Sequence, residues 1–166
     1  MITEAKNLLE GIIKKAVPGI TVVKSAAAET REIMARKFPL VSLITNRGSF
    51  DESGARTVRY FEGEQYRERY ARGFRKLPIV IRCWENGEDK ASELAGDIIP
   101  EIPSQWEYDG FTNHVQIGAE EHSDNARSLK KPYVSVIEVI FTGTAARKPQ
   151  EAPVIEKTEI EDGELA

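Results

Sequence analysis

The residue types best suited to metal or acid–base chemistry gather in one short stretch of the second half of the chain. His114, Glu120 and His122 have the same parity, so an unbroken strand would present all three on one face. His114 is nevertheless six residues from Glu120, about 20 Å along a strand that rises ~3.3 Å per residue, which is too far for one ion. Only Glu120 and His122 could share a ligand, and a solvated strand face explains the three side chains better.

The adjacent residues lack the geometry of a catalytic site. His122, Ser123 and Asp124 have the residue types of a hydrolytic triad, but triad members meet from separate elements and consecutive residues cannot form the relay. Glu120 and Glu121 would point to opposite faces of a strand, which excludes a paired-carboxylate site. Phosphate-binding glycine loops, the nucleophile elbow and zinc motifs do not occur. The sequence therefore predicts a protein without catalytic residues, metal or cofactor.

Cys83 is the only cysteine, and it lies in a run of strand-forming residues, 79–84. A reactive thiol needs a nearby base or a helix N-terminus to lower its pKa. Only Arg82 is adjacent, and its side chain would point to the opposite face of the strand. We therefore expect Cys83 to be a buried packing residue, in a protein that occupies a reducing compartment.

Charge is strongly segregated along the chain. Residues 56–82 hold eight basic and three acidic residues, a net charge of +5, with aromatic residues interleaved. Residues 85–124 hold eleven acidic residues and one lysine, a net charge of −10. The basic stretch could bind single-stranded nucleic acid, form an exposed hairpin that packs on its own sheet, or form a protein–protein surface. The opposed acidic stretch favours the protein–protein surface, and the overall charge of −4 argues against a dedicated nucleic-acid-binding protein.

Hydrophobic periodicity predicts the helices that must position these residues. An apolar stripe over 8–16 predicts an N-terminal helix, and a second stripe over 91–99 predicts a helix capped by Asp89. Residues 25–37 are ambiguous but favour a further helix, with Ser25 as its cap.

The strands are predicted from apolar runs and from alternation. The segments 40–45 and 133–141 are apolar on both faces, as expected inside a sheet. Residues 111–121 alternate, which places Phe111, Val115, Ile117 and Ala119 on one buried face. The remaining predicted strands cover 20–24, 57–61, 66–74 and 77–84, and 46–54 is predicted to be an exposed loop.

Together these elements predict an α+β fold. We expect a mixed, mainly antiparallel β-sheet, two or three helices packed on one face, and a protruding Arg-rich hairpin. Residues 1–145 form one domain, and residues 146–166 form an acidic tail that is expected to be disordered in isolation. No segment is long and apolar enough to cross a bilayer, and the N-terminus does not look like a secretory signal. The predicted core consists of Leu9, Ile12, Ile13, Val41, Leu43, Ile79, Ile81, Leu94, Ile98, Val115, Ile117, Ile137 and Val139.

Several segments of the sequence resemble the tail terminator proteins of long-tailed phages, also called tail completion or head–tail joining proteins. The resemblance covers about residues 1–145 and is clearest from Arg69 onward. It runs through Tyr-Ala-Arg-Gly-Phe-Arg at 70–75, the strand 77–84, the helix with its apolar stripe over 91–98, the phrase 120–126 and the last apolar strand. The acidic tail lies outside this pattern.

The resemblance implies a structural, non-enzymatic protein of the virion tail, encoded by a phage or prophage and assembled in the bacterial host cytoplasm. It implies a homo-oligomeric ring, expected to be a hexamer, that caps the tail tube and presents a surface to the head–tail connector protein. DNA would meet the ring only while passing through its lumen, and no membrane partner is implied. Head-to-tail contacts between unlike surfaces can close into a ring, so we predict a subunit interface formed by Arg69, Arg72, Arg75, Arg82, Glu120, Glu121 and Asp124.

Two alternatives stay open. The chain could be another phage neck component or a baseplate-proximal adaptor of similar fold. It could also be a nucleic-acid-binding module that uses the Arg/aromatic hairpin.

Overall fold

The computed structural model describes residues 1–52, 56–62, 65–122 and 132–146; within these, the side chains of 56–62, 65–70, 120, 122 and 146 lie outside the description. Helices and strands follow the predicted order with additions, and the α+β class is confirmed. The elements are α1 (Ile2–Ala16), β1 (Thr21–Val23), α2 (Ala26–Met34), β2 (Leu40–Thr45), β3 (Ser49–Asp51), β4 (Arg56–Glu62), β5 (Gln65–Glu85), α3 (Glu88–Ile98), the short 3-10 helix η1 (Ile99–Glu101), β6 (Gln105–Tyr108), β7 (Phe111–His122) and β8 (Tyr133–Ala146).

The sheet is mainly antiparallel and is built around one long strand. Its strand order is β1-β2-β5-β8-β7-β6, and only β1 and β2 pair in parallel. The 21 residues of β5 form a single strand, so the prediction of separate strands over 66–74 and 77–84 is wrong. Pro78 lies where the neighbour of β5 changes from β3 to β2, and its carbonyl accepts a hydrogen bond from Asn46 N at 2.9 Å. A proline is tolerated at such a break in the ladder, so the strand continues through it.

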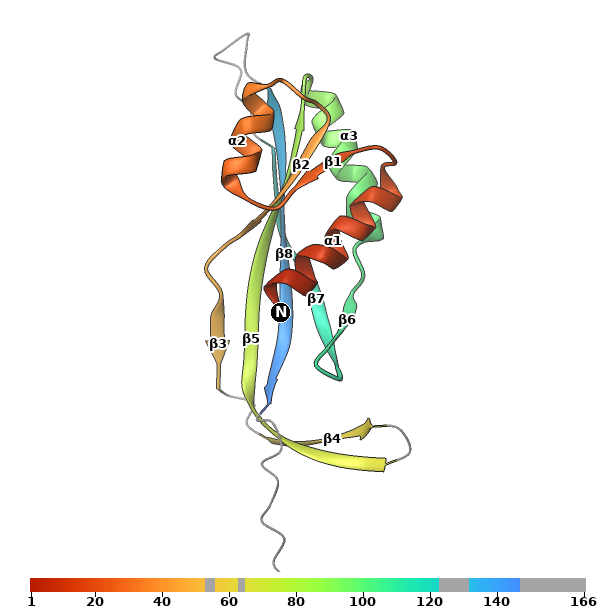
Figure 1. Ribbon diagram of the computed structural model, residues 1–166, viewed down its shortest axis with the longest axis vertical. Coiled ribbons are helices and arrows are strands. Elements are labelled where there is room, and N and C mark those ends of the chain that lie inside the picture. The colour runs from red at the N-terminus through yellow and green to blue at the C-terminus, as the bar shows by residue number, and fades with distance from the viewer. Residues whose placement is uncertain (53–55, 63–64, 123–131, 147–166) are drawn as a thin grey trace, which may run out of the picture.

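Helices lie on both sides of the sheet (Figure 1). α1 and α3 pack on the face that carries Val41, Ile81 and Cys83, which forms the main core. α2 lies against the opposite face, where its Glu29 contacts Ser42. Two helices therefore cover the face of the main core, as predicted. The third helix, α2, packs on the opposite face, so the expectation that the helices share one face does not hold for it.

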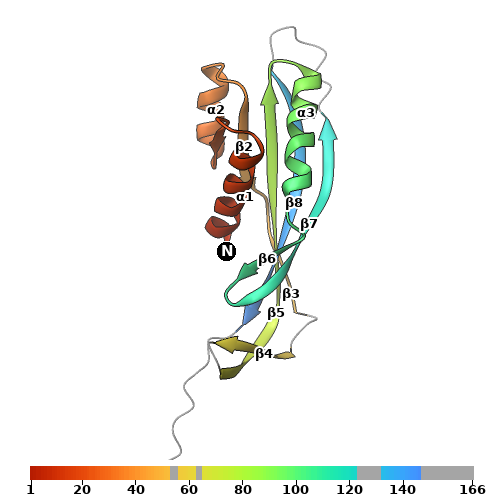
Figure 2. The same cartoon turned by 90° about the vertical axis from the view of Figure 1, so that its right-hand side faces the viewer.

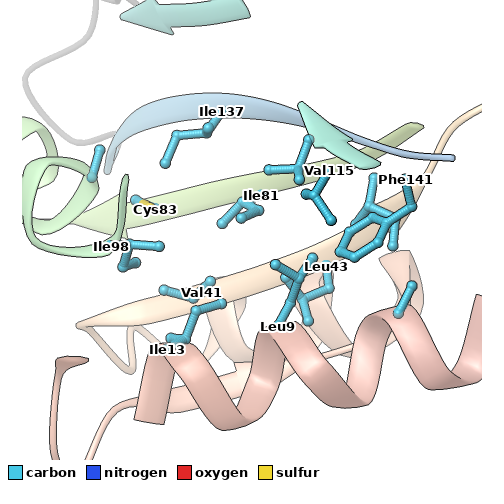
Figure 3. Close-up of a cluster of buried hydrophobic side chains, with 14 of the residues drawn as sticks. Leu9, Ile13, Val41, Leu43, Ile81, Cys83, Ile98, Val115, Ile137 and Phe141 are labelled. Atoms are coloured by element: carbon cyan, nitrogen blue, oxygen red, sulfur yellow. The ribbon is translucent and has the colours of Figure 1, made fainter. Parts of the chain in front are cut away.

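The predicted core is largely confirmed. Figure 3 shows Leu9 and Ile13 of α1 packed toward Val41 and Leu43 of β2, with Phe141 of β8 beside them. Cys83 is buried in the same cluster, as predicted. Two predicted core positions are wrong, because Ile12 is only half-buried on α1 and Ile117 is 39% exposed on β7.

A β-bulge changes which face of β7 is buried after Ile117. Ile117 is paired with Val139, whereas Ala119 is paired with the next residue along β8, Glu138, so Gly118 is an extra residue. An inserted residue reverses which face the following side chains occupy. Ala119 is therefore exposed instead of continuing the buried face predicted from the alternation.

Smaller differences concern element ends and short strands. Ser25 caps α2 as predicted, accepting a hydrogen bond from Ala28 N at 3.3 Å. Gly87 is the N-cap of α3, so Asp89 lies inside the first turn and is not the cap. Residues 49–51 form β3 within the predicted loop, β6 was not predicted, and β8 continues beyond the predicted end at residue 141 to Ala146.

β4 pairs with the first residues of β5 in an antiparallel hairpin, from Arg56 opposite Ala71 to Glu62 opposite Gln65. Figures 1 and 2 show this pair turning away from the long axis of the sheet. The arginine side chains of this hairpin lie outside the described residues. The exposed Arg-rich surface of the hairpin therefore stays a prediction.

Candidate assembly surface

The N-terminal half of β5 carries exposed basic side chains. Arg72, Arg75 and Lys76 are all exposed. The ladder between β5 and β8 is irregular between Ala71 and Gly73, so the simple alternation of an unbroken strand does not carry across Arg72. The side chain of Arg69 lies outside the described residues.

Arg72 has a partner within the subunit that could be exchanged for another. Its Nη2 donates to Glu52 Oε1 at 3.1 Å, and both side chains are 65% exposed. An exposed pair of this kind contributes only ~0–1 kcal/mol, because water and salt screen it. Arg72 therefore remains available for contact with an acidic surface of another copy.

Arg82 is held within the subunit. Its Nη1 donates to Glu29 Oε2 at 3.0 Å, while the other oxygen of Glu29 accepts from Ser42 Oγ at 2.6 Å and from Trp84 Nε1 at 2.8 Å. Glu29 is buried, so its charge is compensated by these three donors. Arg82 thus holds α2 on the sheet.

The acidic stretch of the sequence forms a separate surface. Glu88, Asp89, Glu93 and Asp97 are exposed on α3. The two acids of the first turn also interact favourably with the positive end of the helix dipole. Among the predicted acidic interface residues, Glu121 is exposed on β7, the side chain of Glu120 lies outside the described residues, and so does Asp124 as a whole.

β7 supplies an open strand edge beside these acids. Within the described part of the chain, β6 pairs with β7 only up to His114, and from Gln116 to His122 β7 has β8 as its one neighbour. Unpaired N–H and C=O groups on an edge can accept a strand of another chain. Exposed Ile117 adds an apolar side chain to this edge.

The described residues do not gather into a site for metal or acid–base chemistry. None of the described part forms a group of three or more His, Cys, Asp and Glu that could hold a metal. His114 is exposed and Cys83 is buried. Across the same residues, no helix is both long and apolar enough to span a membrane.

The resolved pKa shifts of longer-range pairs belong to the surface between α1 and β1. Hydrogen bonds from Lys14, at 2.6 Å, and then from Lys24 lower the pKa of Glu10. Burial, and after it the charge of Lys24, lowers the pKa of Lys6, whose Nζ donates to Lys24 O at 2.8 Å. Glu10 is therefore paired with Lys14 of the same helix and with Lys24, which follows β1, and Lys6 adds a hydrogen bond from α1 to the same residue.

Sequence reasoning missed the apolar part of the basic surface. Ile2 and Phe50 are 50% and 44% exposed, and both lie beside Arg75 and Lys76. A large aromatic residue inside the turn-rich segment 46–54 was the available signal, because such segments are otherwise polar.

Known proteins provide no assignment for these surfaces. No model of a known protein family matches the chain, and a search of curated proteins found no match.

Proposed function

We propose that this protein is a structural subunit of a phage-type tail that assembles into a ring at the head-side end of the tail tube. The observation that carries the proposal is the placement of opposite charges on separate surfaces of one subunit. Arg72 and Arg75 are exposed on β5, whereas the acids lie on α3 and on β7. Unlike surfaces favour head-to-tail contacts, which close into a ring when the rotation between subunits permits.

The contact we propose joins the basic half of β5 to the acidic end of β7 in the next subunit. Arg69 and Arg72 would face Glu120, Glu121 or Asp124 of that subunit. Charge complementarity would set the register and speed encounter more than it raises affinity. The open edge of β7 supports this placement, because β8 ends opposite Ala71 and residues 65–70 of β5 have β4 as their one neighbour in the described part of the chain. Main-chain hydrogen bonds between these two edges would add stability that surface ion pairs lack.

In this proposal the ring is a hexamer that binds the tail tube protein below and the head–tail connector above. The ring is a scaffold for joining, so the reaction chemistry of an active site is not needed. DNA passes through the lumen and makes no sequence-specific contact.

Native mass spectrometry of the full chain, with negative-stain electron microscopy, tests the proposal. We expect one closed assembly of six subunits with a central lumen. A protein that remains monomeric or dimeric, both alone and with the tail tube protein, would contradict it.

The exposed arginines also allow a nucleic-acid-binding module as a second candidate. Fluorescence anisotropy with a labelled oligonucleotide separates the two functions. Binding that is strong at low salt and falls steeply as salt rises would favour the module. Absence of binding at low salt, together with a ring, supports the tail protein.

A further inference from the structure

A hollow of about 330 Å³ lies between the N-terminus of α1 and β3, against β5. Ile2 and Phe50 line it, and these are two of the four large apolar side chains that are clearly exposed in the described part of the chain. Exposed apolar side chains that gather around one concave surface indicate a binding site more often than scattered ones do.

The hollow is also cationic. Exposed Arg75 lines it, and none of the described residues that line it is acidic. Lys76 also borders the hollow, but as the next residue of β5 it directs its side chain to the opposite face of the strand. A smaller hollow that shares Arg75 contains Asp109, so the part of the lining without an acid is the side of Phe50. An occupant that fits must combine apolar side chains with negative charge.

We propose that this hollow binds the acidic C-terminal segment, residues 150–166, of a neighbouring copy of the protein. This inference rests on the ring of the proposed function and names a second contact within it. The segment holds six acidic residues and a single lysine. Its apolar residues Val154, Ile155, Ile160 and Leu165 are interspersed among those acids, which matches the apolar and basic lining of the hollow.

The course of β8 directs the segment to a neighbour. β8 passes Arg75 at Gly143 and ends at Ala146 opposite Ala71, so it leads away from the hollow of its own subunit. The residues after Ala146 can span up to about 66 Å at ~3.3 Å each, which is enough to reach the next subunit of a ring.

A contact between neighbouring subunits would also allow a site of low intrinsic affinity to be occupied. Exposed ion pairs are individually weak, and an acidic peptide of this composition is expected to be disordered when it is free. Within a ring, however, the segment is tethered beside its site, and tethering raises the effective concentration to the millimolar range. We therefore expect the segment to dock on assembly and to be free in the isolated subunit.

Photo-cross-linking in the full chain tests the inference. A photoreactive residue is placed at Ile160, and equal amounts of ¹⁴N- and ¹⁵N-labelled protein are mixed before assembly. We expect cross-links between chains, identified by mass spectrometry, to the peptide that contains Phe50. The substitution Arg75→Glu should lower their yield at least fivefold, whereas Arg31→Glu, the same charge change elsewhere, should not.

A second variant keeps the test decisive if the charge reversal disturbs folding. Phe50→Ser removes an exposed apolar side chain, leaves Arg75 in place, and should also lower the yield at least fivefold. Cross-links confined to one chain, cross-links elsewhere, or a yield unchanged by both variants would overturn the inference. A ring without cross-links at Phe50 would refute this inference and leave the proposed function standing. Cross-links between chains at Phe50 without a ring would support the tail contact and count against the ring.

Discussion

Glu29 attaches α2 to the sheet through side-chain hydrogen bonds. It is the buried residue of that helix, and its carboxylate accepts from Ser42, Arg82 and Trp84. A buried carboxylate stabilises a structure only when enough donors compensate for its lost hydration. Because the helix buries little apolar surface, its position depends on this carboxylate more than on packing.

We predict that Glu29→Ala destabilises the protein by about 3 kcal/mol, the low end of the range for breaking a buried pair, since Arg82 is partly exposed. The substitution leaves three donors without their acceptor. Urea titration followed by circular dichroism measures the free energy of unfolding. The control Glu93→Ala removes an exposed carboxylate from α3 and should change that free energy by less than about 0.5 kcal/mol. If the two substitutions lowered the free energy of unfolding equally, the hydrogen bonds of Glu29 would not stabilise the protein more than an exposed carboxylate does.

The sequence predicts the burial of some single residues and not of others. Cys83 was predicted to be buried because its run of strand-forming residues and the lack of an activating neighbour are local features. Glu29 could not be predicted, because a glutamate in a short polar helix is normally exposed. Its donors Ser42, Arg82 and Trp84 lie 13 to 55 residues away along the chain, and only the tertiary fold brings them together.

At the scale of elements, β3 approaches β5 closely because Gly73 has no side chain. A Cβ at this position would lie against the carbonyl oxygen of Asp51, far inside van der Waals contact. The neighbour is backbone, so it cannot rotate away as a flexible side chain could. The position of β3, which borders the proposed tail site, therefore depends on this glycine.

We expect Gly73→Ala to destabilise the protein by about 1–3 kcal/mol, the usual range for overpacking a closely packed contact. The matched control is Gly96→Ala on α3, where an added Cβ meets nothing within 4 Å. That change should stabilise the protein by up to about 1 kcal/mol, since alanine is the better helix former. Thermal unfolding of both variants provides the measurement, and a stabilised Gly73→Ala protein would refute the close approach.

The apolar face of α3 yields a prediction that follows from the sequence as well as the structure. Leu94 is 6% exposed and packs in the core cluster. Leu94→Ala should cost on the order of 2–5 kcal/mol, because it removes buried methyl groups and leaves a cavity. Met34→Ala on α2, where the side chain is 79% exposed, should cost under about 0.5 kcal/mol. A denaturant titration in which Leu94→Ala costs no more than this control would contradict the burial of the α3 face.

Long periodic elements were predicted from the sequence, whereas features set by pairing were not. The bounds of β2 were predicted correctly, because its residues are apolar on both faces. β3 and β6 are three and four residues long, which is too short to show the alternation of apolar and polar residues that identifies a strand. The bulge at Gly118 and the continuity of β5 through Pro78 arise from register with β8, which a single segment of sequence does not encode.

At the scale of the whole molecule, the charge layout was visible in the sequence before any fold was known. The structure places the described members of each group on the surface, with Arg72 and Arg75 on β5 and Glu121 on β7. It also engages Arg82 within the subunit, which the charge pattern could not indicate. Contacts between copies depend on the relative placement of two surfaces, so the interface itself remains a proposal.

Charge reversal on the basic surface tests that interface. We predict that Arg69→Glu together with Arg72→Glu lowers the oligomer fraction at fixed protein concentration, measured by analytical ultracentrifugation. The pair is chosen because single exposed ion pairs are worth only ~0–1 kcal/mol, so one substitution could pass unnoticed. Neither residue lines the proposed tail site, which keeps this test separate from the cross-linking experiment.

Two further variants make the result specific to this contact. Glu121→Lys in the reversed background should partly restore the oligomer, because it re-creates an opposite charge across the interface. Lys15→Glu with Arg31→Glu changes the net charge equally on exposed positions of α1 and α2, and it should leave the oligomer fraction unchanged. The difference between wild type and the reversed variant should also shrink as salt rises, since screening weakens exposed charges. An oligomer fraction that is the same in the reversed variant and in wild type at low salt would exclude this surface from the ring contact.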